Sequence, residues 1–145
     1  MKWGILGIRL VLAGIFLYSG LVKAGASEEF ALALVPFTII PTAWIGTFAM
    51  VLTWLEIVVG LSLLVPRVYP LAAAMVVLLT IIFIGALSWA LSNGIIVDCG
   101  CFGRDEAPSA FKMVLAMGRD VLIGAGALAV IFWWFREKAA SRDRG

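Results

Sequence analysis

The sequence predicts an all-α integral membrane protein, a four-transmembrane-helix bundle formed by the single domain 1–145. Its composition, its hydropathy and its apolar segments support this class. Hydrophobic residues make up 63% of the chain, charged residues only 14%, and the mean hydropathy is +1.11. Soluble domains are about 45–50% apolar and about 25% charged. Four apolar segments are also long enough to span a bilayer, which takes about 20 residues in a helix.

The composition also excludes several classes of function. Lys and Arg total 11 against 9 for Asp and Glu, and without a long basic run there is no electrostatic basis for nucleic-acid binding. The absence of histidine from the sequence excludes His-based catalytic triads, His metal sites and His pH switches. Two cysteines are too few for a small disulfide-stabilised scaffold.

The first predicted span covers residues 4–22 and contains one charged residue, Arg9. A short helix is predicted over residues 28–35, because Ser27 is a typical N-cap and two glutamates follow it in the first turn. Since this helix is too short to cross a bilayer, we expect it to lie on the membrane surface.

The other three spans are separated by proline-containing segments and by one long polar connection. The second span covers residues 42–65 and contains Glu56, the third covers 70–91 and has no charge, and the fourth covers 113–135. Prolines mark the turn between the second and third spans, because proline lacks a backbone donor and forces the preceding residue out of helical geometry.

The distribution of Lys and Arg predicts that both termini are cytoplasmic, in a multi-pass protein of the bacterial inner membrane. The inner side then carries Lys2, Arg67, Arg136, Lys138, Arg142 and Arg144, against Lys23, Arg104, Lys112 and Arg119 on the outer side. A cleavable signal peptide is the alternative for the N-terminus, because Lys2, an apolar run and Ala24-Gly25-Ala26 have its outline. Against this alternative, the apolar run is long and contains Arg9.

Both cysteines lie in the polar connection between the third and fourth spans, in the string Asp98-Cys99-Gly100-Cys101-Phe102-Gly103. In the predicted orientation this connection is extracytoplasmic, where disulfides persist. A disulfide between residues i and i+2 needs a bend, which Gly100 permits. So small a ring removes little entropy from the unfolded chain, whereas strained and exposed disulfides tend to be labile and catalytic. We therefore predict that Cys99 and Cys101 are a redox pair.

Two other interpretations of the cysteine pair stay open. In the first, the thiols have no role, although they are the only two cysteines of the chain and lie close together on a polar loop. In the second, Cys99 and Cys101 bind a metal ion. Structural zinc takes four ligands, and this motif offers two thiolates and at best Asp98. Such a site would need dimerisation or a soft ion of low coordination number, Cu(I) or a mercuric ion.

Two charged neighbours act on the cysteine pair in opposite ways. The negative charge of Asp98 disfavours a thiolate next to it, although the same carboxylate could accept the proton of an attacking thiol. Arg104 favours the thiolate. We assign Cys99, Cys101 and Asp98 as candidate catalytic residues, supported by Gly100 and Arg104.

Two charged residues inside the spans are predicted to pair, because buried charges in membranes usually face the bundle interior in pairs. By helix rise, Arg9 lies about 8 Å and Glu56 about 14 Å from the inner ends of their spans, a difference that an arginine side chain can cover. The sequence thus predicts an Arg9–Glu56 ion pair that either fixes helix register or handles protons or substrate. Lys23, at the outer end of the first span, lies too far from Glu56 by the same arithmetic and is predicted to be a poor partner.

Arg119 and Asp120 are predicted in the outer part of the fourth span, toward the cysteines. Because they are adjacent, they do not face each other on a helix. Either side chain is a candidate to line an outward-facing cavity beneath Cys99 and Cys101, with anchoring at the membrane interface as the alternative.

Several glycines in the predicted spans would let neighbouring helices approach closely. They are Gly14, Gly20, Gly60, Gly85, Gly124 and Gly126. None forms a GxxxG pair, so the sequence gives no signal of dimerisation and leaves the oligomeric state open.

Three strings of residues, with the arginine early in the first span, resemble the MauE branch of the DoxX-like membrane proteins. They are Gly14-Ile-Phe-Leu-Tyr-Ser-Gly20-Leu-Val-Lys23, Trp54-Leu-Glu56-Ile-Val-Val-Gly60 and Asp98-Cys-Gly-Cys-Phe-Gly103. The resemblance covers nearly the whole chain, and the cysteine string is its most specific part. It implies a four-helix membrane protein with a redox-associated role. In that family Cys99 and Cys101 would be the redox pair, and Arg9, Lys23 and Glu56 polar positions of unassigned role.

The resemblance further implies a role in methylamine utilisation, where the disulfide-rich small subunit of methylamine dehydrogenase matures beside a thioredoxin-like partner. The leading hypothesis is a protein of the lipid bilayer that exchanges electrons with a periplasmic thioredoxin-like protein or a disulfide-containing client. Quinone is a weak candidate cofactor, because membrane thiol oxidases that reduce quinone generally carry two cysteine pairs. The alternatives are a transporter that captures a soft metal ion or a sulfur species on the thiols, and a non-catalytic membrane assembly subunit.

Overall fold

The computed structural model describes residues 2–36, 41–96 and 109–142, and it confirms the all-α prediction. Its helices are α1 (Lys2–Gly25), α2 (Ser27–Leu34), the 3-10 helix η1 (Thr42–Trp44), α3 (Ile45–Leu64), α4 (Tyr69–Ser92) and α5 (Ala110–Arg142). Four segments are long and apolar enough to cross a membrane, namely Trp3–Gly25, Thr42–Leu64, Tyr69–Ser92 and Ala110–Arg142. The described residues therefore fit a multi-pass membrane protein.

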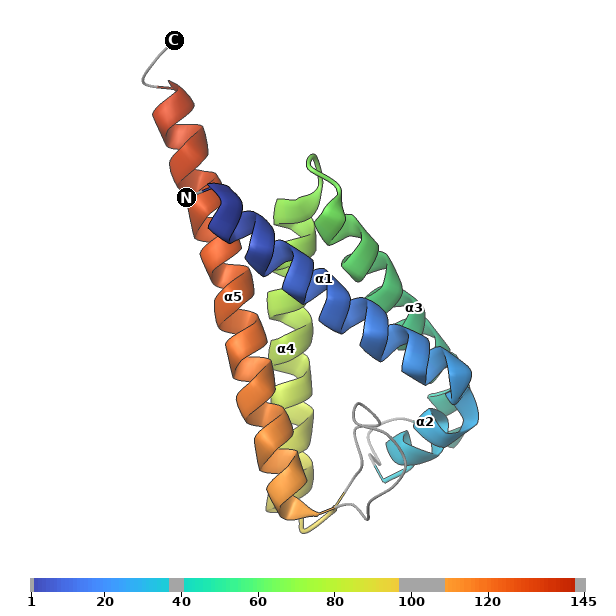
Figure 1. Cartoon of the computed structure of the whole chain (residues 1–145). Helices are drawn as coiled ribbons and strands as arrows, with labels where there is room; N and C mark the ends of the chain where they lie inside the picture. The colour runs from blue at the N-terminus through green and yellow to red at the C-terminus, as the bar shows by residue number, and fades with distance from the viewer. Residues whose placement is uncertain (1, 37–40, 97–108, 143–145) are drawn as a thin grey trace.

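The four long helices form an elongated bundle that α1 crosses obliquely (Figure 1). Both ends of the described chain and the turn between α3 and α4 lie in the upper part of that view, which we call the terminal end. The short helix α2 and the two chain ends that flank residues 97–108 lie at the opposite end, which we call the loop end. The connection that contains the cysteines is thus anchored at the end of the bundle away from both termini.

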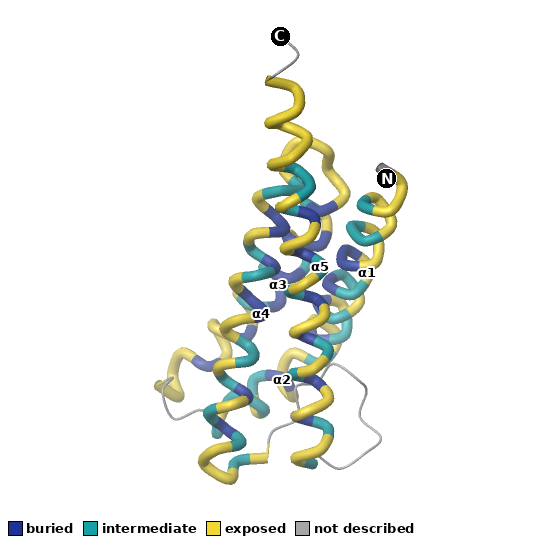
Figure 2. Tube along the Cα trace, turned by 90° about the vertical axis from the view of Figure 1, so that its left-hand side faces the viewer, coloured by how far each residue is buried: buried dark blue, intermediate teal, exposed yellow. Residues whose placement is uncertain are grey.

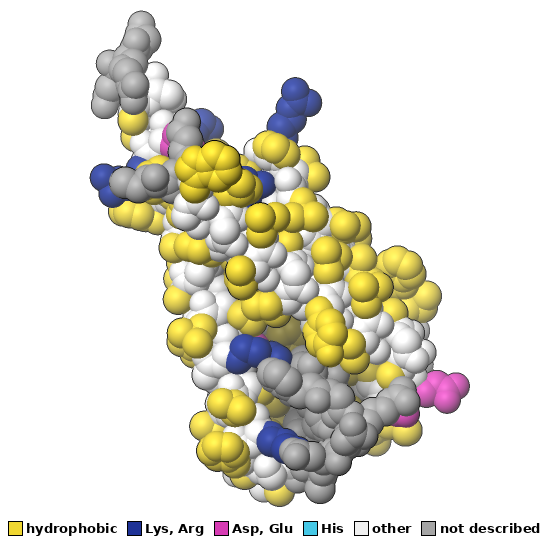
Figure 3. Space-filling model, in the orientation of Figure 1, with side chains coloured by type: hydrophobic (Ala, Val, Ile, Leu, Met, Phe, Trp, Pro, Cys, Tyr) yellow, Lys and Arg dark blue, Asp and Glu magenta, His cyan; other side chains and the backbone are white. Residues whose placement is uncertain are grey.

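Buried residues follow the inward faces of the helices (Figure 2). The main core includes Leu12, Phe16, Val59, Leu63, Val76, Ile123 and Val130, and a second cluster between α4 and α5 contains Leu87, Ala90, Met113 and Ala116. The outward faces carry exposed hydrophobic side chains such as Val11, Leu61, Leu71, Leu122 and Phe132. On the face shown in Figure 3, Lys and Arg side chains gather at the terminal end and in the loop-end half. The exposed hydrophobic side chains between these charged regions suit contact with lipid.

The helices pack most extensively as two pairs, α1 with α3 and α4 with α5. Glycines permit the close approach in the first pair: a Cβ on Gly20 would lie 2.6 Å from Ile57 Cγ1, and one on Gly60 would lie 2.9 Å from Leu17 Cγ. Gly124 and Gly126 also lie against other helices, next to Thr80 of α4 and to Ile8 and Leu12 of α1. The prediction of close packing is wrong for Gly14 and Gly85, since no atom of the described residues lies within 4 Å of a Cβ built there.

The short helix after the first span is present, but it begins one residue earlier than predicted. Ser27 is its first residue rather than its N-cap, and the N-cap is Ala26, which forms no side-chain cap hydrogen bond. The reason is that α1 continues to Gly25, so the chain turns at Ala26 alone, whose carbonyl accepts from Phe30 N at 3.0 Å. The location of α2 on the membrane surface stays a prediction.

The end of α4 turns the chain sharply before the cysteine connection. Gly94 has a φ of +69°, a left-handed conformation that glycine adopts without a Cβ clash. Ile95 N donates to Ala90 O at 2.9 Å and Gly94 N to Leu91 O at 3.1 Å, the paired bonds of a Schellman motif. Ile95 also packs against the cluster that contains Ala90, which fixes the direction in which the chain leaves the helix.

Candidate functional site

The predicted catalytic motif lies outside the described residues. Asp98, Cys99, Gly100, Cys101 and Arg104 all fall within residues 97–108. The structure describes the two ends that anchor this segment, the Schellman turn after α4 and the start of α5 at Ala110. The roles of these five residues stay predictions.

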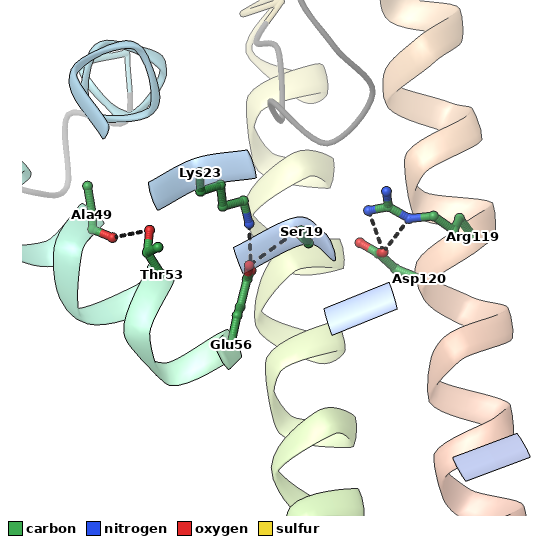
Figure 4. A network of polar contacts seen from close by, with 7 residues as sticks. All are labelled: Ser19, Lys23, Ala49, Thr53, Glu56, Arg119 and Asp120. Atoms are coloured by element: carbon green, nitrogen blue, oxygen red, sulfur yellow. Dashed lines mark hydrogen bonds and ion pairs between the residues drawn. The ribbon is translucent and has the colours of Figure 1, made fainter. Parts of the chain in front are cut away.

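The described part of the site is a buried ion pair between α1 and α3 (Figure 4). Lys23 Nζ donates to Glu56 Oε1 at 2.5 Å, and Ser19 Oγ donates to Glu56 Oε2 at 3.1 Å. Both charged side chains are 3% exposed. Glu56 therefore pairs with Lys23, and the predicted Arg9–Glu56 pair is wrong.

The inclination of α1 explains why Lys23 rather than Arg9 reaches Glu56. Residues 17–20 of α1 pack against residues 57–60 of α3, while the N-terminal half of α1 reaches α5 near Gly126. Because α1 runs obliquely across the bundle, it advances less than the usual rise of about 1.5 Å per residue along the bundle axis. The prediction treated all spans as upright and level, which placed Lys23 too far from Glu56.

Arg9 instead binds the last turn of α3. Its Nε and Nη2 donate to the carbonyl oxygen of Leu63 at 3.1 and 2.8 Å, and its guanidinium carbon lies 4.0 Å from the centroid of the Tyr69 ring. The last four carbonyls of a helix lack partners within the helix, so Arg9 satisfies one of them. Arg9 thereby joins α1 to the end of α3 and the start of α4.

Two aromatic rings also lie close to the Lys23 ammonium group. Its Nζ lies 4.8 Å from the centroid of the Phe30 ring and 5.1 Å from that of Phe83. Phe30 belongs to α2 and Phe83 to α4, so side chains from three other helices surround the end of one lysine. The attraction of an ammonium ion to aromatic faces adds to its ion pair with Glu56.

The second buried acidic group is Asp120 of α5 (Figure 4). Arg119 Nη2 donates to Asp120 Oδ1 at 2.9 Å and Nε donates to the same oxygen at 3.2 Å. Although adjacent residues do not face each other on a helix, these two side chains are in contact, because the long arginine side chain folds back to the carboxylate of the next residue. The Asp120 side chain is 6% exposed and that of Arg119 27%, so the acid faces the bundle and the base lies near its edge.

Sequence reasoning missed Ser19, Phe30 and Phe83 as partners of the buried pair. A signal for Ser19 was present, because it lies four residues before Lys23 and therefore on the same face of the helix. Phe30 and Phe83 had no such signal, since their positions depend on how α2 and α4 pack.

Comparison with known proteins identifies the same family that the three sequence strings resemble. The family model described as methylamine utilisation protein MauE matches residues 1–135. The chain belongs to the MauE family. Two methylamine utilization proteins MauE are among its relatives: that of Methylophilus methylotrophus is 30% identical over 118 residues, and that of Paracoccus denitrificans is 32% identical over 126 residues.

The alignments cover 81% and 85% of this chain, but only 60% and 66% of those two relatives. The chain thus spans less than two thirds of the length of the curated MauE proteins it matches. No solved structure shows significant similarity to it. In this member of the MauE family, the polar contacts described above are the Lys23–Glu56 ion pair, the hydrogen bonds of Arg9 to Leu63 and those of Arg119 to Asp120.

Proposed function

We propose that this MauE-family chain is a membrane thiol–disulfide exchange protein. Its Cys99 and Cys101 would exchange electrons with a periplasmic thioredoxin-like protein and with a disulfide-containing client, of the methylamine dehydrogenase type in methylamine-utilising bacteria. The observation that carries the proposal is that the only two cysteines of the chain are separated by a single residue, Gly100, in the connection between α4 and α5.

The arrangement of the helices supports an extracytoplasmic position for this connection. Both described chain ends lie at the terminal end, together with exposed Arg67 in the turn after α3, and the connection is anchored at the loop end. If the positively charged terminal end is cytoplasmic, as the positive-inside rule favours, the cysteines face the periplasm. There a disulfide persists and a secreted client is accessible.

The proposed reaction is a two-electron exchange that is balanced without any further reactant. A thiolate of the reduced partner attacks one sulfur of the Cys99–Cys101 disulfide, forming a mixed disulfide and releasing the other cysteine as a thiolate. The partner's second thiol then attacks the mixed disulfide. The partner leaves as a disulfide, and Cys99 and Cys101 remain as a dithiol that holds two electrons and, after protonation, two protons. The same steps in reverse transfer the electrons to the disulfide of the other partner.

Trapping of the mixed disulfide tests this proposal. In Cys101→Ser, the remaining Cys99 has no neighbouring thiol to resolve an adduct, so an epitope-tagged chain from acid-quenched cells should run at higher mass on a non-reducing gel. The adduct should disappear with reductant, and mass spectrometry should identify a thioredoxin-like protein or a client protein bound to Cys99.

The control is Cys99→Ser/Cys101→Ser, which should form no adduct at comparable expression. Cys99→Ser alone reports whether the second cysteine also attacks partners. Absence of any adduct from both single variants would contradict the exchange function.

A further inference from the structure

The ammonium group of Lys23 occupies a small site made by side chains of three other helices. Glu56 of α3 provides the carboxylate at 2.5 Å, and Phe30 of α2 and Phe83 of α4 provide aromatic rings whose centroids lie 4.8 and 5.1 Å from Nζ. Lys23 and Glu56 are 3% and 2% exposed as whole residues. The ion pair at the centre of this site is therefore almost completely buried, and Phe30 beside it is buried as well.

This combination has the chemistry of an alkylammonium receptor. Cations within about 6 Å of an aromatic centroid are attracted by the ring, and sites lined by aromatic side chains recognise ammonium ligands in many proteins. The carboxylate adds a charge-assisted hydrogen bond, and Ser19 Oγ holds its other oxygen at 3.1 Å. The four methylenes of the Lys23 side chain carry the ammonium group from α1 to this site.

We propose that Glu56, Phe30 and Phe83 form a binding site for a primary alkylammonium ion, and that the side chain of Lys23 is its built-in ligand. The occupied site ties α2 and α4 to the α1–α3 pair through a single cation. Because Lys23 is attached to the chain, its effective concentration at the site is high, and a free amine competes with it poorly. The proposal is independent of the chemistry of Cys99 and Cys101.

Chemical rescue of Lys23→Ala tests the site. This substitution removes three carbons and the ammonium group, a fragment that n-propylammonium replaces. Purified Lys23→Ala in detergent micelles should have a lower Tm than the native chain, followed by tryptophan fluorescence. Addition of n-propylammonium should restore at least half of the lost Tm in a saturable way. Methylammonium should restore less because it is shorter, and the neutral isostere n-propanol should have no effect.

Matched variants separate binding in this site from general effects of amines. The native chain, whose site is filled, should show no saturable shift with n-propylammonium. Lys23→Ala/Glu56→Gln should show none either, because the carboxylate that binds the cation is lost. Phe83→Leu in the Lys23→Ala background should weaken the apparent affinity for n-propylammonium about fivefold, as expected for loss of one aromatic face.

Two results would overturn the proposal: no saturable shift of Lys23→Ala with n-propylammonium, or an equal shift in Lys23→Ala/Glu56→Gln. If Lys23→Ala does not fold alone, the amines are supplied during expression and solubilisation. Recovery of monodisperse protein with n-propylammonium but not with n-propanol supports the site, and recovery with neither contradicts it.

Discussion

The buried partners Lys23 and Glu56 each protect the other from being an isolated charge inside the bundle. Removal of one partner of a buried ion pair costs about 3–5 kcal/mol, whereas joint replacement by neutral groups is often close to neutral. Single and double substitutions of Lys23 and Glu56 therefore measure both the stability that the pair provides and the energetic coupling between the two side chains.

We expect Lys23→Met and Glu56→Gln to lower the free energy of unfolding by about 3–5 kcal/mol each, since each leaves one uncompensated charge. The double variant should recover most of this loss, because neither charge remains. Thermal unfolding in micelles, followed by tryptophan fluorescence, measures all three. Losses that simply add in the double variant would show that the two side chains do not interact.

Arg9 stabilises the bundle by a different contact, its bidentate hydrogen bond to the carbonyl of Leu63. Hydrogen bonds that involve a charged group contribute about 1.5–3 kcal/mol, so Arg9→Met should destabilise the protein by about 2 kcal/mol. The matched control is Arg67→Met in the exposed turn after α3, which should leave the unfolding temperature unchanged. Equal effects of the two substitutions would contradict the contact with Leu63.

At the residue scale, the sequence distinguishes the unusual side chains but not their partners. Glu56 and Arg9 stand out because charges inside apolar spans are rare. Lys23 lies one residue beyond the first predicted span, and the sequence predicts it to be a poor partner for Glu56. Their pairing depends on the inclination of α1, a property of packing that helix rise alone does not determine. The same holds for Phe30 and Phe83, which are ordinary apolar residues until α2 and α4 bring them to Lys23.

At the scale of the elements, the crossing of α1 and α3 depends on two glycines. A Cβ at Gly60 would lie 2.9 Å from Leu17 Cγ and 3.2 Å from Leu17 N, so the backbone itself must move. Gly20 lies in the same interface, 3.3 Å from Ile57 N on the same measure. In the interface that contains Lys23 and Glu56, the backbones of α1 and α3 thus lie close together at both glycines.

Gly60→Ala should destabilise the protein by about 1–3 kcal/mol, the usual penalty of overpacking. Gly85→Ala is the matched control, because Gly85 lies in α4 and an added Cβ there would have no neighbour within 4 Å in the described part of the chain. It should be neutral or stabilising by up to about 1 kcal/mol, since alanine favours helix more than glycine does. Chemical or thermal unfolding measures the stability of the two variants side by side. A larger loss of stability in Gly85→Ala than in Gly60→Ala would contradict the close packing of α1 against α3 at Gly60.

The spans and the turns between them could be predicted because they depend on local properties of the chain. Length and apolarity identify four spans, and prolines identify the turn between α3 and α4. The start of α2 lies one residue before the predicted start because α1 continues to Gly25. Where one helix ends and the next begins depends on both segments together, so neither segment alone predicts the boundary.

For the whole molecule, the two ends of the bundle differ in what they hold. The terminal end holds both described chain ends, and the loop end anchors the connection that contains Cys99 and Cys101. The redox account requires that this connection face the periplasm and that the two thiols join and separate reversibly. The sequence predicts both requirements through its charge distribution and its cysteine spacing.

The most direct test is mass-tag labelling of the cysteines in intact cells with a membrane-impermeant maleimide. After mild reduction of whole cells, the account predicts that Cys99 and Cys101 each take one tag from outside. After treatment with an oxidant they should take none, and the tags should return on a second reduction. Labelling that appears only after the membrane is permeabilised, or that never changes with redox state, would contradict it.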